Sequence, residues 1–287
     1  MLKLRSTGRG GDYSVLRGLI ESAQSLIYAG GWPARLLDQW TGDRTPEVRV
    51  VDHQLACGRA GRPPLRLAFA SDLHIGPLTS TRILEAAFAR LAALAPDVLV
   101  LGGDYVSLEV TPRMGDVLER LVAGVTAAVK VAVLGNHDLW TDHTIVERAL
   151  ARAGATVLVN QNIRLPPPHD DVALVGLDDP WTGTPDAAAA FAGTADAGVR
   201  VAVVHAPEGY PFVRDRAAAL MLCGHTHGGQ IATPRGPIVV PGPLGPRWPA
   251  GLYEVDGMAL YVSRGVGVVD LPVRLFAPPD VASFTIT

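Results

Sequence analysis

The chain has 287 residues, of which 48% are hydrophobic and 18% charged, and this composition excludes a disordered protein. Lysine and arginine number 25 against 28 aspartate and glutamate residues, which gives a formal net charge of −3. This balance argues against a general electrostatic attraction to nucleic acid. Cys57 and Cys223 follow no paired spacing, so we interpret them as small apolar residues in a reducing compartment.

The N-terminal stretch from Tyr13 to Trp40 contains a helical pattern of apolar residues. The residues at helical spacing are Val15, Leu16, Leu19, Ile20, Ala23, Leu26 and Ile27. Two interpretations remain open. The helix packs on the domain core or on a partner, or it rests on a membrane surface with Tyr28, Trp32 and Trp40 near the headgroups.

Charges and glycines interrupt any apolar run in the first residues, so the chain shows no secretory signal. No segment approaches the roughly 18 uninterrupted apolar residues of a spanning helix. We therefore expect a cytoplasmic protein, peripheral on the inner face of the membrane if the N-terminal helix binds lipid. Residues 1–60 are predicted to form an amphipathic helical extension, and residues 61–287 the main domain.

After residue 60, apolar strands alternate with amphipathic helices. Strands are predicted at Leu67–Ala70, Val98–Leu101, Val131–Leu134, Thr156–Val159, Ala173–Gly176, Val201–Val204 and Leu220–Cys223. Helices are predicted at Thr81–Leu94, Gly115–Ala127, Thr144–Ala153 and Pro185–Ala192. This order favours an α/β fold with a largely parallel sheet. Residues 238–287 alternate short strands with Gly and Pro turns, which predicts an antiparallel region that completes a second sheet.

Polar side chains gather where five of these strands end. They are Asp72 and His74 in SDLH, Asp104 in GGD, Asn136, His137 and Asp138 in GNHD, His205 in HAP, and His225 and His227 in GHTH. In an open α/β sheet, ligands bind beyond the carboxyl ends of the strands, so we expect these loops to converge on one crevice. Each fragment alone is compatible with an ordinary turn or a hydrogen-bonded histidine, and only their joint occurrence indicates a shared site.

The residue types at these strand ends indicate divalent cations. Imidazole and carboxylate together, without thiolate, suit Mn²⁺, Fe²⁺ or Zn²⁺. Seven ligand candidates are too many for one structural zinc, which takes four, and they suit two ions that share a bridging carboxylate. Two-metal sites hold their ions about 3.5–4 Å apart, lower the pKa of a shared water and offset charge on phosphate oxygens.

In this order, the motifs SDLH, GGD, GNHD, HAP and GHTHGGQ resemble the calcineurin-like metallophosphoesterase superfamily, from about residue 65 to the C-terminus. The GHTHGGQ form, with the later LYVSRGVGVVDLPVRLFAPPD, is similar to a YkuE-like bacterial phosphodiesterase branch. That branch includes enzymes that hydrolyse the pyrophosphate of UDP-2,3-diacylglucosamine, a reaction of lipid A biosynthesis. The resemblance implies an α/β fold that is a four-layer α-β-β-α sandwich of two mixed β-sheets flanked by helices.

The resemblance also implies a role for each site residue. It assigns one metal to Asp72, His74 and His227, the other to Asn136, His205 and His225, and the bridging position to Asp104. His137 would stabilise charge on the phosphate or protonate the leaving oxygen. One position departs from the family pattern, because Ser107 stands where a second Asp commonly supports the catalytic histidine. Either Asp138 or another acid then orients His137, or its role as a general acid is weaker.

We therefore expect a two-metal phosphoesterase that hydrolyses a phosphodiester or pyrophosphate through a metal-bridging hydroxide. The expected cofactors are two divalent ions, Mn²⁺ first and Fe or Zn as alternatives, and a lipid-linked nucleotide such as UDP-2,3-diacylglucosamine is a candidate substrate. The alternatives are a non-catalytic metal-binding or scaffold protein on the same fold, and a cyclic-nucleotide phosphodiesterase. No nucleic-acid partner is expected, because the charge balance shows no basic track. Arg235, Arg247 and Arg264 are candidates for contact with substrate phosphate.

Overall fold

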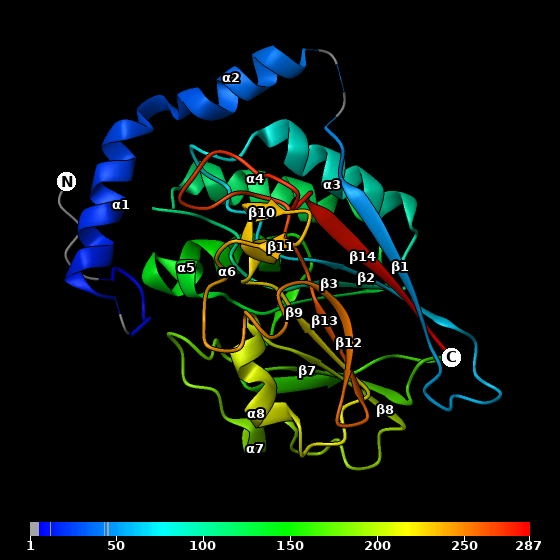
Figure 1. Ribbon diagram of the computed structural model, residues 1–287. Helices are drawn as coiled ribbons and strands as arrows, with labels where there is room; N and C mark the ends of the chain where they lie inside the picture. The colour runs from blue at the N-terminus through cyan, green and yellow to red at the C-terminus, as the bar shows by residue number, and fades with distance from the viewer. Residues whose placement is uncertain (1–5, 12, 43, 45) are drawn as a thin grey trace.

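The computed structural model describes residues 6–11, 13–42, 44 and 46–287, and two β-sheets form its centre (Figure 1). Helices lie outside the sheets, and two more reach out from the N-terminal side. The helices are α1 (Val15–Ile27), α2 (Trp32–Thr41), α3 (Thr81–Ala93), α4 (Pro112–Ala123), α5 (Asn136–Trp140), α6 (His143–Arg152), α7 (Ala187–Ala190) and α8 (Tyr210–Val213).

The first sheet is mixed, with strand order β1-β14-β2-β3-β4-β5. Its strands are β1 (Arg49–Leu55), β2 (Leu65–Ala70), β3 (Val98–Leu101), β4 (Val129–Ala132), β5 (Thr156–Val157) and β14 (Asp280–Ile286). From β2 to β5 all neighbours are parallel, whereas β14 runs antiparallel to β2 and parallel to β1. The carboxyl ends of β2, β3 and β4 therefore lie at one edge, where the loops that carry the predicted site begin.

The second sheet is also mixed, with strand order β12-β13-β9-β8-β7-β6. Its strands are β6 (Gln161–Arg164), β7 (Val172–Gly176), β8 (Val199–Val203), β9 (Leu220–Cys223), β12 (Gly251–Val255) and β13 (Met258–Val262). The central strands β7, β8, β9 and β13 are parallel, and antiparallel strands close both edges. A small separate ribbon pairs β10 (Ala232–Thr233) with β11 (Gly236–Pro237).

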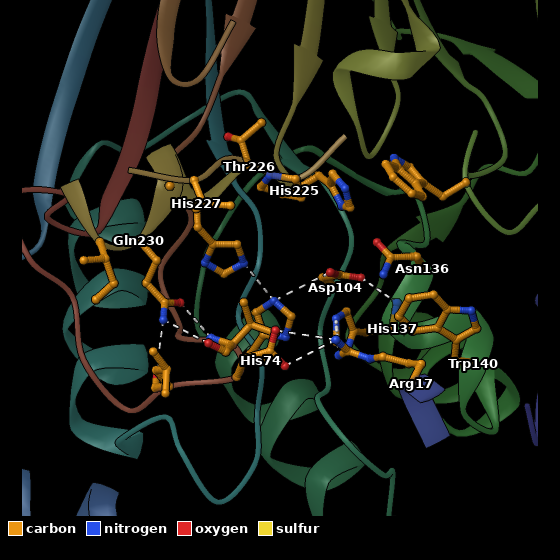
Figure 2. Close-up of a pocket in the computed structure, with 18 residues that line it drawn as sticks. Arg17, His74, Asp104, Asn136, His137, Trp140, His225, Thr226, His227 and Gln230 are labelled. Atoms are coloured by element: carbon orange, nitrogen blue, oxygen red, sulfur yellow. Dashed lines mark hydrogen bonds and ion pairs between the residues drawn. The ribbon is translucent and has the colours of Figure 1, made fainter. Parts of the chain in front are cut away.

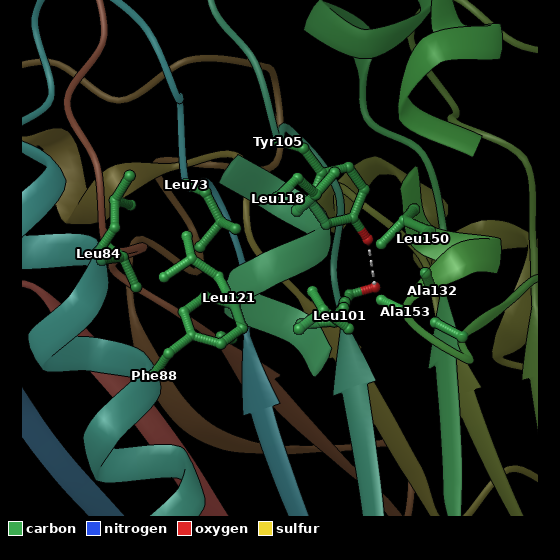
Figure 3. Packing of buried hydrophobic residues seen from close by; sticks show 14 of the residues in the cluster. Leu73, Leu84, Phe88, Leu101, Tyr105, Leu118, Leu121, Ala132, Leu150 and Ala153 are labelled. Carbon is green, nitrogen blue, oxygen red and sulfur yellow. Dashed lines mark hydrogen bonds between the residues drawn. The ribbon is translucent and has the colours of Figure 1, made fainter. Parts of the chain in front are cut away.

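Three hydrophobic clusters give the layer order. One cluster lies between the sheets and includes Phe69, Leu174 and Phe284. A second packs the other face of the first sheet against α3, α4 and α6, and Figure 3 shows part of it around Leu121. A third packs the second sheet against α7, α8 and the segment around Trp248. The order is therefore helix, sheet, sheet, helix, which confirms the expected α/β sandwich of two mixed sheets.

Several elements differ from the sequence prediction. The strand predicted at 131–134 begins and ends two residues earlier, as β4, and β1, β6, α2, α5 and α8 were not predicted. Residues 238–287 complete the second sheet through the antiparallel pair β12 and β13, as predicted, and their last strand, β14, inserts between β1 and β2 of the first sheet. Residues 49–55, inside the segment predicted as a helical extension, form an edge strand. The domain boundary at residue 60 stays a prediction.

Helix α1 turns its polar face toward the domain and its apolar face away from it. Gly18, Glu21 and Gln24 are buried, and the Tyr13 hydroxyl donates a hydrogen bond to Glu21 at 2.6 Å. The exposed apolar side chains of α1 and α2 are Val15, Leu16, Leu19, Ile20, Leu26, Ile27, Trp32, Leu36, Leu37 and Trp40. Packing of this apolar face on the domain core is therefore ruled out. Among the described residues, no helix is both long enough and apolar enough to span a bilayer.

Candidate metal centre

The loops after β2, β3, β4, β8 and β9 converge on one cavity of about 440 Å³, within the usual size range of small-molecule sites (Figure 2). Six of the predicted site residues line this cavity, namely His74, Asp104, Asn136, His137, His225 and His227. Asp72 and His205 lie just behind them, fully buried, and contact the lining residues. The structure therefore brings together all the residues predicted for the site.

Asp104 lies at the centre of this cluster. Its Oδ2 atom is 3.3 Å from Nε2 of His205 and 3.6 Å from Nε2 of His74. Ligand atoms lie close enough to share an ion in three groups, which are Asp72 with His74 and His227, Asp104 with His205 and His225, and His74 with Asp104 and His137. The first group has the residues of one predicted ligand set, and the second contains His205 and His225 of the other set together with Asp104; the role of Asn136 as a ligand stays a prediction.

Two potential ligand atoms of the cluster are buried without a hydrogen-bond partner among the described residues, namely Asn136 Oδ1 and His225 Nε2. Nε2 of His205 faces only the Asp104 carboxylate, at 3.3 Å. The other ring nitrogen of His205, Nδ1, lies 2.8 Å from the carbonyl oxygen of Gly102, and donation to that carbonyl leaves a lone pair on Nε2. Buried polar atoms without partners are costly, and nitrogen and oxygen donors of this kind suit divalent cations. The residues therefore fit a metal centre.

The protonation states of part of the cluster agree with that fit. Burial lowers the pKa of His74 to about 4 and of His225 to about 3, so both imidazoles are neutral at neutral pH, as metal ligands must be. Burial opposes the charge on Asp104, but His205 and His137 hold the pKa of this carboxyl well below its usual value. Asp104 therefore remains a carboxylate. Two ligands shift the other way: burial raises the pKa of Asp72 to about 7, and Asp104, against the effect of burial, holds the pKa of His205 well above its usual value.

The backbone of the cluster adopts a conformation that side chains rarely tolerate. Positive φ angles occur at Asp72 (56°), His74 (44°), Asp104 (55°), His225 (71°) and His227 (52°). Non-glycine residues in this region are strained, and such residues concentrate at functional sites. The strain at these five positions is therefore a further sign that the loops form a functional site.

Glycines allow the loops to approach one another closely. A Cβ atom on Gly135 would lie 2.3 Å from Oδ1 of Asp104, and one on Gly224 would lie 2.1 Å from Oδ2 of Asp72. Any larger side chain at these positions would therefore displace a carboxylate of the cluster. These contacts explain the glycines that precede Asn136 and His225 in the sequence.

Asp138 does not contact the His137 imidazole, so it does not orient the ring directly. Its carboxylate accepts hydrogen bonds from the backbone N–H groups of Asp104 (2.9 Å), Tyr105 (2.9 Å), Val106 (3.3 Å) and Gly135 (2.9 Å). Asp138 therefore joins the loop that carries Asp104 to the loop that carries His137. The Ser107 hydroxyl is buried and has no partner among the described residues, so it does not replace the missing acid.

A charged neighbour of the His137 imidazole comes from α1. Nη2 of Arg17 lies 3.4 Å from Nε2 of His137, and the guanidinium carbon lies 5.4 Å from the ring centroid of Trp140. The predicted phosphate contacts Arg235, Arg247 and Arg264 do not line the cavity. Sequence reasoning missed Arg17 and Trp181, because no local motif marks a contact between residues this far apart in the chain. It also missed Trp140, which lies in α5 with His137.

The half-buried Arg274 organises the loop that closes the other side of the cavity. Its guanidinium donates to the carbonyls of Gly267, Arg264 and Ala277, and Nη2 lies 3.1 Å from Nδ1 of His227. Burial lowers its pKa to about 10, so the group stays charged at neutral pH. Arg274 thus holds the loop that presents Asp270 to α1, within the sequence LYVSRGVGVVDLPVRLFAPPD.

Comparison with known proteins agrees with this geometry. The family model for calcineurin-like phosphoesterases matches residues 65–229. The chain is 32% identical to phosphodiesterase YaeI of Escherichia coli over 81% of this chain and 86% of that protein. It is 30% identical to the uncharacterised metallophosphoesterase YkuE of Bacillus subtilis over 92% and 93%, respectively. It is 25% identical to the UDP-2,3-diacylglucosamine pyrophosphatase LpxG of Chlamydia muridarum over 76% of this chain and 82% of that protein.

The family match spans more than half of the chain and begins at β2, the first strand that carries site residues. It covers all five loops that meet at Asp104, up to the GHTHGG stretch. This family uses divalent metals, in agreement with the ligand groups described above. The chain therefore belongs to the calcineurin-like phosphoesterase family and is a metal-dependent hydrolase.

Proposed function

We propose that this protein hydrolyses a phosphodiester or pyrophosphate bond with two divalent ions. Asp72, His74 and His227 would hold one ion, and Asn136, His205 and His225 the other. The observation that carries the proposal is the position of Asp104, whose carboxylate lies between the two ligand groups and within 3.6 Å of a histidine from each. Mn²⁺ is the first candidate metal, with Fe or Zn as alternatives.

Bound at these ligands, the two ions would supply a deprotonated water as nucleophile and offset charge on the phosphate oxygens. The protein side chains would do the rest. Asp104 Oδ1 accepts a hydrogen bond from the backbone N–H of His137 at 2.9 Å, so the bridging residue and the histidine are fixed relative to each other. His137 would contact a phosphate oxygen or give a proton to the leaving oxygen from the open side of the cavity.

The cavity rim supports a substrate with a hydrocarbon part. Trp140, Trp181, Ile231, Val239 and Leu271 line the cavity beside the polar cluster. Val239 and Leu271 are also exposed, with 72% and 50% of their surface accessible, so the apolar lining continues out of the mouth. A lipid-linked phosphoester, such as UDP-2,3-diacylglucosamine, would match a site that is polar at its base and apolar at its rim.

The outward face of α1 and α2 supports contact with a membrane surface through residues 13–40. α1 lies beside the cavity mouth, because Gln24 and Tyr28 hydrogen-bond to Asp270, the residue before Leu271. The exposed apolar side chains of α1 and α2 and those of Val239 and Leu271 would then face the same lipid surface. Trp32 and Trp40, both exposed, are suited to the headgroup region.

Hydrolysis tests the catalytic proposal. We expect wild-type protein loaded with Mn²⁺ to hydrolyse bis-p-nitrophenyl phosphate and a panel that includes UDP-2,3-diacylglucosamine, simple monoesters and cyclic nucleotides. Asp104→Asn removes the shared charge, so metal analysis should find fewer than two ions and activity should fall at least about a hundredfold. Activity that survives this substitution would contradict the two-metal proposal, and a wild type inert toward every substrate would favour a non-catalytic protein.

Liposome co-sedimentation tests the membrane proposal. We expect Leu16→Asp combined with Leu26→Asp to reduce binding to vesicles that contain anionic lipid, because both side chains are exposed on α1. Leu252→Asp is the matched control, since Leu252 is an exposed apolar residue of β12 on the second sheet. If wild-type protein does not bind vesicles, or forms a dimer that the double substitution dissociates, then the apolar face covers a protein surface and the membrane proposal is wrong.

A further inference from the structure

The guanidinium of Arg17 enters the metal cavity from outside the family match, which begins only at residue 65. Arg17 lies on the polar face of α1 and lines the cavity together with His74, Asp104 and His137. Its side chain retains 21% of its accessible surface, so it is held in place but not sealed from the cavity. Figure 2 shows it beside His137.

Two carboxylates hold the guanidinium through its Nε and Nη1 atoms. Nε donates to Glu21 at 3.0 Å, and Nη1 lies 3.3 Å from Asp270. Glu21 is buried and turns away from water, whereas the Asp270 side chain is 47% exposed, so solvent weakens its attraction. The remaining nitrogen, Nη2, points to the cavity side, and the contact found for it is the His137 imidazole. Arg17 therefore presents an oriented N–H donor next to His137.

We propose that Arg17 is a substrate-binding residue, whose Nη2 donates hydrogen bonds to a phosphate oxygen of the substrate beside His137. This inference rests on the proposed function, since it places the anion at the metal cluster. Arginine suits the task because its fixed planar fork matches phosphate geometry and its charge is permanent. It also makes α1 a part of the active site, so that the same helix would carry both an exposed apolar face and a phosphate-binding group.

A purely structural role for Arg17 would explain less. Other residues of α1 and the cap that follows it also hold the helix on the domain. Gln24 Nε2 donates to the Asp270 carboxylate at 3.0 Å, and the Tyr28 hydroxyl donates to the Asp270 carbonyl. The N-terminal segment adds backbone hydrogen bonds from Thr7 to Trp140 and from Gly10 to Leu139. A fastening role also gives no reason for Nη2 to face the catalytic histidine.

The experiment compares Arg17→Gln, Arg17→Lys and the control Gln24→Ala in the full-length, Mn²⁺-loaded protein. Gln24→Ala removes a contact between α1 and Asp270 without touching the cavity. We expect Arg17→Gln to lower kcat/KM for bis-p-nitrophenyl phosphate about ten- to a hundredfold, as expected for the loss of hydrogen bonds to a charged group. Arg17→Lys should recover part of this loss, and Gln24→Ala should stay within about twofold of wild type.

A second measurement separates anion binding from helix placement. The affinity for inorganic phosphate, measured by calorimetry and as competitive inhibition, should weaken in Arg17→Gln by a similar factor and not in Gln24→Ala. Equal effects of Arg17→Gln and Gln24→Ala, or unchanged phosphate affinity in Arg17→Gln, would overturn the inference. If wild-type protein hydrolyses no phosphoester, the proposed function fails, and calorimetry with phosphate still decides the role of Arg17.

Discussion

Substitution of Asp138 by Asn should destabilise the protein strongly, because this buried carboxylate ties together two loops of the metal centre. Oδ1 accepts from the N–H groups of Tyr105 and Val106, and Oδ2 accepts from those of Asp104 and Gly135. The side chain itself is fully buried, and burial, together with the charge of Asp104, raises its pKa to about 8. We nevertheless assign the ionised form, because a protonated acid would direct its own O–H at backbone N–H donors. An amide group offers one oxygen and one NH₂, so whichever way it is oriented, two backbone donors face another donor.

The magnitude follows from the number of orphaned donors. A buried N–H group that loses its acceptor costs about 1–3 kcal/mol, so two of them cost about 2–6 kcal/mol before relaxation. Domains of this kind are stable by only about 5–15 kcal/mol, so Asp138→Asn should remove a large share of the free energy of unfolding. Asp138→Ala, which leaves four donors without an acceptor, should cost more still.

Urea denaturation of the metal-free protein measures this effect, with the slope of the transition compared between variants. The matched control is Asp170→Asn, which breaks the ion pair of Asp170 with Arg62, where both side chains are more than 40% exposed. It should cost less than about 1 kcal/mol. If Asp138→Asn changed the free energy of unfolding by no more than this control, and instead only lowered activity, then Asp138 would act on the His137 imidazole and the present interpretation would be wrong.

Two further predictions concern packing and pH. Gly224→Ala should lower the free energy of unfolding by about 1–3 kcal/mol and weaken metal binding, because the added Cβ would overlap Ser71 and Asp72. The control is Gly198→Ala, whose Cβ would make only ordinary contacts and should change neither property. Thermal melts and metal analysis measure the two effects. Burial lowers the pKa of His53, which stacks on Phe284 in the first sheet, so the folded state favours the neutral ring. The neutral His53 ring contributes fully to the free energy of unfolding above about pH 6.5, and this contribution is lost as the pH falls below that value. The decrease in Tm on acidification should therefore be smaller for His53→Phe than for wild type. An equal decrease would refute this assignment.

Much of the fold could be predicted because the decisive signals are local. β3 and β9 have the predicted bounds, since each is a short run of apolar residues that is buried on both faces. β1 was not predicted, because its sequence RVVDHQL alternates poorly and its strand character comes from pairing with β14 at the other end of the chain. Pairing between residues more than 200 positions apart leaves no trace in either segment alone.

The metal centre could be predicted for a similar reason, and its surroundings could not. Each candidate ligand follows a recognisable strand, so sheet topology brings Asp72 and Asp104 together at one edge, and the packing of the second sheet on the first adds His205. The arginine beside His137 depends instead on how α1 docks, which the helical pattern does not specify. The same applies to Asp138, which the sequence places next to His137 although its carboxylate turns to the backbone of the neighbouring loop.

The orientation of α1 determines two things at once. It exposes the apolar stripe of the helix, and it places Arg17 beside His137, where the acid common in the family is missing. Burial of a Leu or Ile side chain contributes about 1.5–3 kcal/mol, and α1 forgoes part of this at each of its outward apolar residues. A rotated helix could recover that energy on the domain, but it would then withdraw Arg17 from His137 and leave Glu21 without Tyr13. The polar contacts hold the helix in the orientation that exposes its apolar face. If a lipid surface covers that face, the energy is regained without moving Arg17, and the substrate would meet the metals at the same surface.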